Sequence, residues 1–151
     1  MNIEMKSIGI VRSPIKEEVD TNWGNVISEI HVSTEYIPGL KGLNDFSNLL
    51  VLFYMHKSTF DPKHDLVRRP RGRDDMPLIG IFAQRAKHRP NPIGVTVVKL
   101  IDVKEGVLVV KGLDAIEGTP VVDIKPYVPV FDDTNDVVVP EWIKIIMKDY
   151  F

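Results

Sequence analysis

A chain of 151 residues is long enough for one domain with a substantial hydrophobic core and short for two. Hydrophobic residues make up 44% and charged residues 26%, which argues against a disordered chain, and no apolar run approaches the length of a membrane span. The chain contains no cysteine, which excludes disulfides and thiolate metal sites, and its amino terminus lacks the apolar core of a signal peptide; we therefore expect a single cytoplasmic domain over residues 1–151.

Short predicted strands alternate with turns along most of the chain. Their signals are alternation of apolar and polar residues, or short apolar runs bounded by Gly, Pro or Asn. The predicted strands lie at residues 5–11, 26–32, 49–55, 78–83, 95–102, 107–111 and 121–124. The run at 49–55 is almost wholly apolar, so we expect that strand to be covered on both faces.

Two other segments have a different character. Residues 59–77 show neither a helical nor a strand period, which predicts a long loop. Residues 140–149 predict a helix, because Trp142, Ile143, Ile146 and Met147 fall on one stripe. Taken together, the segments predict a mainly β fold, a small β-barrel or sandwich with long loops and one C-terminal helix.

Charge is distributed unevenly. The net charge is −2, yet residues 63–89 carry eight Lys or Arg against three Asp or Glu. Such a tract is typical of a protein that meets a polyanion with one face, although a solvated basic loop explains the charge equally well. The tract ends in Pro90-Asn91-Pro92, which holds its polar side chains on a stiff connector between two strands.

Two long motifs identify a family. The runs IGIFAQRAKHRPNPIG and LDAIEGTPVVDIKPY resemble the signature segments of the TsaA-like tRNA methyltransferase O family, and the resemblance extends over about residues 7–131. It implies a small β-barrel enzyme, homodimeric, that uses S-adenosylmethionine to methylate the exocyclic amine of threonylcarbamoyl-adenosine beside the anticodon of tRNA. The chain has no Gly-x-Gly turn, so any such cofactor site must be built from the loops of a β scaffold.

The resemblance also implies site residues at the matching positions. The implied cofactor-binding residues are Lys57, Ser58, Arg85, Val95, Lys111, Gly112, Leu113 and Asp114. The implied contacts to the target nucleotide are Arg89, Asn91, Lys125 and Tyr127. Among the cofactor residues, Arg85 is the candidate donor to the methionyl carboxylate and Asp114 the candidate carboxylate for ribose hydroxyls or the amino group. No general base is identified.

Several alternatives stay open at this point. Asp114 and Glu117, which stands where relatives commonly have aspartate, also suit ordinary turn carboxylates, and Tyr127 also suits simple packing. The four histidines match no familiar ligand spacing, so we expect no metal. A different class of protein, a non-enzymatic β-barrel module that binds RNA or a nucleotide, would share the basic loops and the β scaffold.

Overall fold

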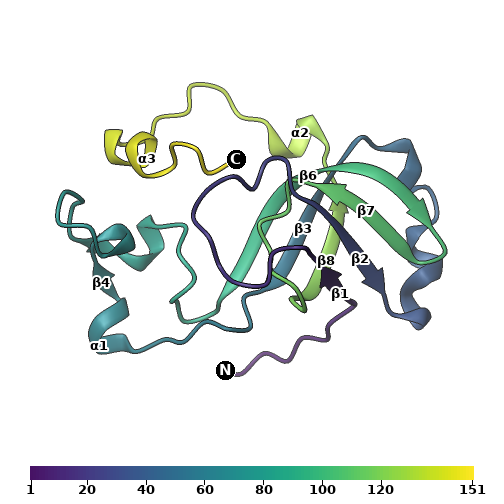
Figure 1. The fold of residues 1–151 in the computed structure, drawn as a ribbon, viewed down its shortest axis with the longest axis horizontal. Coiled ribbons are helices and arrows are strands. Elements are labelled where there is room, and N and C mark those ends of the chain that lie inside the picture. Colours follow the sequence, from purple (N-terminus) through teal and green to yellow (C-terminus); the bar gives the residue numbers. More distant parts are fainter.

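Six strands form a closed antiparallel barrel in the computed structural model, which describes residues 1–151 (Figure 1). Their order around the barrel is β1-β2-β7-β6-β3-β8. The bounds are β1 Gly9–Arg12, β2 Ile27–Val32, β3 Asn48–Tyr54, β6 Ile93–Lys104, β7 Val107–Lys111 and β8 Pro120–Pro126. The predicted mainly β barrel is therefore confirmed, and the six corresponding strands were predicted within a few residues of their bounds.

Alternate residues of each strand point into the barrel, because side chains along a strand alternate between its two faces. Most of these inward side chains are apolar. The core comprises Val11, Ile30, Val32, Leu49, Val51, Phe53, Val98, Leu108, Val110, Leu113, Ala115 and Val121. Strand β3 departs from the prediction: Leu49, Val51 and Phe53 are buried, whereas Leu50 and Leu52 are only half-buried. The outer face of β3 is therefore only partly covered, and the prediction that both faces of this strand are covered is wrong.

Phe53 and Gly94 make a close contact where β3 and β6 pair at the barrel mouth. The two residues are register partners, and a methyl group placed on Gly94 would come within 2.3 Å of the Phe53 ring. The Phe53 side chain is itself buried, so it has little room to withdraw. Glycine at the end of the PNPIG motif is therefore explained by the aromatic ring that lies against its backbone.

Small elements lie beside the barrel and form what we call the arm (residues 59–90) (Figure 1). The arm contains α1 (Pro62–Asp65), β4 (Val67–Arg68) and β5 (Ile79–Gly80), with 3-10 turns at Pro70–Gly72 and Ile81–Ala83. The predicted long loop at 59–77 contains α1, β4 and a 3-10 turn, and the predicted strand at 78–83 is reduced to the two residues of β5, followed by a 3-10 turn. Elements of two to four residues are too short to show a period in the sequence.

Polar contacts, one exposed and two involving the buried Gln84, hold the arm together. The Asp61 side chain accepts a hydrogen bond from the Lys63 N–H and so caps α1. Gln84 is buried, and its side-chain amide donates to the carbonyls of Arg68 at 3.0 Å and Ile79 at 3.1 Å. These two bonds link β4 and β5. No local sequence pattern predicts this contact.

The chain leaves the barrel after β8, forms a short helix α2 (Pro129–Asp132), and ends in helix α3 (Glu141–Ile146) near the arm (Figure 1). Helix α3 is shorter than the predicted 140–149: Pro140 is its N-cap and Met147 its C-cap. Two further 3-10 segments, Thr34–Leu40 and Leu43–Asp45, lie between β2 and β3. No helix has both the length and the apolar character needed to cross a bilayer.

Candidate functional site

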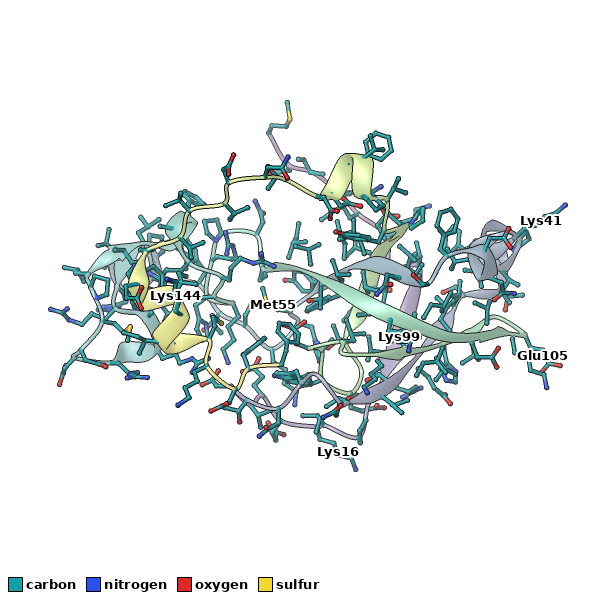
Figure 2. All side chains as sticks on the ribbon, turned by 90° about the horizontal axis from the view of Figure 1, so that it is seen from above. Lys16, Lys41, Met55, Lys99, Glu105 and Lys144 are labelled. Carbon is teal, nitrogen blue, oxygen red and sulfur yellow. The ribbon has the colours of Figure 1, made fainter.

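Two adjoining cavities lie between the barrel mouth, the arm and α3. Their volumes are about 370 Å³ and about 620 Å³. Figure 2 shows Met55, a residue common to both, between the barrel, whose far end carries Lys41 and Glu105, and α3, which carries Lys144. The shared wall consists of Phe53, Met55, Arg85, Ala86, Asp114, Ile143, Met147 and Tyr150.

The two cavities differ in chemistry. The smaller one is lined by charged side chains from four segments, which are Glu18, Asp20, Lys57, Arg68, Arg71, Arg85, Lys87 and Asp114. The larger one is mostly apolar and runs along the outer face of β3 and β6, where it is lined by Leu50, Ile93, Val95, Val97, Met147 and Phe151. Apolar side chains line both cavities, and most of the charged side chains belong to the smaller one. Two cavities that share one wall can hold two ligands in contact.

An acidic strap (residues 17–20) lies against the basic wall of the smaller cavity. Glu18 pairs with Lys87, Glu17 lies 3.5 Å from the Lys57 ammonium, and the Asp20 carboxylate lies 3.7 Å from the Arg71 guanidinium. All three carboxylates of the strap therefore face cations of the cavity.

The strap is anchored by a buried tryptophan. Trp23 is 2% exposed, and its indole N–H donates to the Val19 carbonyl at 2.9 Å. Trp23 therefore anchors this loop, and it also lines the smaller cavity. The sequence holds a partial signal for the strap, because three of its four residues are acidic and residues 63–89 are basic. No sequence pattern, however, predicts that these two segments meet.

Asp114 stands at the junction of the two cavities and accepts two hydroxyl hydrogen bonds. Thr96 donates to its Oδ1, and Tyr150 donates to its Oδ2 at 2.5 Å. Burial, and then the negative charge of Asp114, raise the pKa of the Tyr150 hydroxyl, so it stays protonated and remains a donor. Asp114 is thus a cavity carboxylate, whereas Glu117 lines neither cavity.

Glu117 has a structural partner instead. Its Oε1 accepts from the Arg12 guanidinium at 2.8 Å and its Oε2 from the Ser13 N–H at 2.7 Å. Arg12, and then the Ser13 N–H, lower the pKa of the Glu117 carboxyl below its ordinary value. An ordinary turn carboxylate was an open alternative for both Asp114 and Glu117. The structure supports it for Glu117, which holds the segment that leads into the strap.

The two arginines of the FAQRAKHR motif have different partners. Arg85 donates to the Val95 carbonyl at 2.9 Å, and its exposed guanidinium reaches both cavities. Arg89 lines only the larger cavity and donates to the carbonyls of Gln84 at 3.0 Å and Ala86 at 3.3 Å. Arg89 thus folds the tract back on itself, while Arg85 is left free to meet a ligand.

Five of the twelve predicted site residues come together at the cavities, namely Lys57, Arg85, Arg89, Val95 and Asp114. The other seven line neither cavity, namely Ser58, Asn91, Lys111, Gly112, Leu113, Lys125 and Tyr127.

Most of those seven have other contacts. Leu113 is fully buried in the barrel core, Lys125 pairs with Asp123 at 2.6 Å, and the Tyr127 hydroxyl donates to Asp133. Lys111 pairs with Ile27 in the β2–β7 ladder. Their predicted roles in binding stay predictions.

The sequence analysis missed the contribution of the C-terminal segment. The apolar stripe of α3 supplies Trp142, Ile143, Ile146 and Met147 to the wall of the smaller cavity, and Tyr150 follows it. The signal was present as a helical stripe, but a stripe does not say what it packs against. In the structure the stripe faces a cavity of its own chain, where Ile146 is buried and the other three side chains are half-buried.

No group of three or more His, Asp or Glu side chains is arranged to hold a metal ion. His31 lies on the outside of β2 beside Glu29, and His88 faces the Thr59 carbonyl at 2.7 Å.

Comparison with known proteins gives consistent results. Residues 11–133 match the family model for the tRNA-methyltransferase O N-terminal domain. A probable S-adenosyl-L-methionine-binding protein of Methanothermobacter thermautotrophicus is 40% identical over 131 residues, which cover 84% of this chain and 91% of that protein. The tRNA (adenine(37)-N6)-methyltransferase of Escherichia coli is 38% identical over 146 residues, which cover 89% of this chain and 62% of that enzyme.

The crystal structure of TrmO from P. aeruginosa superposes with a TM-score of 0.76 at 31% identity, covering 94% of this chain and 62% of that one. This chain therefore spans most of the archaeal relative and about three fifths of the two bacterial ones. The resemblance seen in the two sequence motifs is confirmed, and the chain belongs to the tRNA methyltransferase O family.

Proposed function

We propose that this protein transfers a methyl group from S-adenosylmethionine to the exocyclic amine of an adenine in tRNA. The observation that carries the proposal is the shared wall: two cavities, the smaller one with more charged side chains, meet at Arg85 and Asp114. A transfer between two bound molecules needs such a meeting point, because the attacking nitrogen, the methyl carbon and the departing sulfur must lie in line. The family and the relatives named above support the same reaction.

The residues of the site fit the cofactor. The Arg85 guanidinium suits a carboxylate, Asp114 suits hydroxyls or an ammonium, and the apolar side chains of the shared wall suit an adenine ring. When bound, S-adenosylmethionine would supply an electrophilic methyl group. The amine nitrogen would take the methyl group with its lone pair, S-adenosylhomocysteine would leave, and the proton released from nitrogen would pass to solvent.

The protein's own contribution is positioning and exclusion of water. The buried Phe53 and the half-buried Met55 and Met147 lie at the junction and would help to keep it dry. The basic side chains of the arm, Arg68 and Arg71 among them, would contact phosphates of the RNA around the target base. Threonylcarbamoyl-adenosine next to the anticodon is the substrate we infer, in a protein that acts in the cytoplasm.

The test has two stages. Calorimetry with S-adenosylmethionine asks whether the cofactor binds, and failure to bind at millimolar concentration would reject the enzyme. Mass spectrometry of tRNA nucleosides from a strain that lacks the protein asks about the substrate. Loss of the methylated threonylcarbamoyl-adenosine is expected, and unchanged methylation would reject that substrate while leaving the cofactor intact. A protein that binds RNA but does not bind S-adenosylmethionine would instead be a non-enzymatic RNA-binding module.

We also infer a homodimer, with the partner covering the arm. The α3 stripe gives no support, because it faces the cavities. The arm, however, exposes four large apolar side chains, Leu66, Val67, Leu78 and Phe82, the last of them 79% exposed. Exposed apolar side chains within one segment suit an apolar partner surface. Light scattering over a dilution series is the measurement, and a monomer at micromolar concentration with normal cofactor binding would contradict the dimer.

A further inference from the structure

Tyr150 lies outside the part of the chain that matches the family, residues 11–133, yet it reaches the centre of the site. Its hydroxyl lies 2.5 Å from Asp114 Oδ2, across 36 residues of sequence, and its ring belongs to the wall of both cavities. The position of Tyr150 at the centre of the site suggests that it contributes to ligand binding.

The backbone around Tyr150 is fixed by the loop that follows the strap. The Asn22 N–H donates to the Asp149 carbonyl and the Trp23 N–H donates to the Tyr150 carbonyl, both at 2.8 Å. The ring of Phe151 then packs edge-on against the Tyr150 ring, with centroids 4.8 Å apart. Because Trp23 is buried, these bonds attach the segment to a rigid point. The Tyr150 hydroxyl is therefore delivered to Asp114 in a defined position.

The second hydroxyl on Asp114 comes from the opposite side. Thr96 is a buried residue of β6, and its hydroxyl donates to Oδ1 of the same carboxylate. An ionised carboxylate has about four lone-pair positions, two on each oxygen. With one position on each oxygen taken, the group cannot rotate freely, and one position remains on each oxygen. Asp114 is half-buried, so the remaining positions are open to the cavities.

From this geometry we propose that Tyr150 and Thr96 are positioning residues, which fix Asp114 so that it accepts two adjacent hydrogen bonds from the bound ligand. The proposal deepens the proposed function and rests on it. The two adjacent donors would be either the two hydroxyls of a ribose or an ammonium group. S-adenosylhomocysteine carries both, whereas methylthioadenosine keeps the ribose and lacks the ammonium, so the pair of compounds separates the two sources.

The central variant is Tyr150→Phe, which removes the hydroxyl and keeps the ring. We expect its affinity for S-adenosylhomocysteine, measured by calorimetry, to fall about tenfold or more, because a carboxylate that is no longer held would lose one of its two hydrogen bonds to the ligand, a bond to an ionised group. Thr96→Val should weaken binding similarly, and Thr96→Ser, which restores a hydroxyl, should regain most of the affinity. Tyr36→Phe is the matched control, because Tyr36 lines neither cavity, and its affinity should equal that of the wild type.

A double-mutant cycle shows whether Tyr150 acts through Asp114. In an Asp114→Ala background, Tyr150→Phe should change affinity by less than about twofold, because the acceptor is gone. An undiminished effect there would assign Tyr150 a role in packing alone and overturn the proposal. A loss that persists with methylthioadenosine identifies the ribose, and a loss seen only with S-adenosylhomocysteine identifies the ammonium.

The outcomes also separate this proposal from the function on which it rests. If the wild-type protein binds neither compound, the proposed function fails, and this role falls with it. If the wild type binds and both Tyr150→Phe and Thr96→Val bind equally well, only the positioning role is overturned. Thermal unfolding of each variant verifies that it is folded at the temperature of the measurement.

Discussion

Neutralising the acidic strap should strengthen the binding of RNA. The change is Glu17→Gln, Glu18→Gln and Asp20→Asn together, which frees the three cavity cations that these carboxylates now face. The pairs are at least partly exposed, so each should stabilise the fold by no more than about 1 kcal/mol. The variant should therefore fold, and its main effect should be on the binding of a polyanion.

The size of the effect follows from the number of cations. If each freed cation contacts one phosphate, the slope of log affinity against log salt becomes steeper by about 0.7 to 0.9 per cation, or about 2 to 3 for all three. At about 0.1 M salt this corresponds to a gain in affinity of about 100-fold or somewhat more, as an upper limit. Fluorescence anisotropy with a labelled tRNA transcript, over a range of salt concentrations, measures both quantities.

The matched control makes the same change in net charge away from the cavities. Glu29→Gln, Glu35→Gln and Glu105→Gln together also remove three negative charges, and none of these residues lines a cavity. Figure 2 shows Glu105 at the far end of the barrel. The control should leave the salt slope close to that of the wild type. Equal slopes in the two triple variants would refute the reasoning, because the effect would then depend on net charge alone.

Three further variants test the fold around the site. In Gly94→Ala the new methyl group would come within 2.3 Å of the Phe53 ring and should displace it. Thermal stability and cofactor affinity should both fall, and unchanged values for both would mean that the ring moves aside freely. Gln84→Ala removes two buried hydrogen bonds of the arm and should destabilise the protein by about 1–3 kcal/mol in urea unfolding, with an effect near zero counting against the bracing role. Because Arg12 lowers the pKa of Glu117, the ionised carboxylate stabilises the fold above its ordinary pKa, and this stability is lost as the pH falls through the lowered value. Glu117→Gln should therefore flatten the acid limb of stability against pH, and an acid limb as steep as that of the wild type would contradict this.

The barrel could be predicted from the sequence because its signal is local. Alternation of apolar and polar residues in 26–32 matches the alternating burial of β2, and 95–102 and 107–111 are short runs rich in β-branched residues, which are typical of strands. The arm could not be predicted, since elements such as β4 and β5 contain two residues each and owe their place to Gln84. Such short pieces have no period.

The site divides in the same way. The motif around Arg85 and the turn that contains Asp114 could be identified from the sequence, because a rigid basic segment and a carboxylate beside a tight turn are each local features. Their convergence depended on closure of the barrel, which brings the end of β3 and the start of β6 to one mouth. The partners of these residues, Tyr150 on Asp114 and the strap on Lys87, are separated from them by 36 and 69 positions. Only the tertiary structure decides such pairs, because single contacts of this kind are weak and form where the packed core has already fixed the backbone.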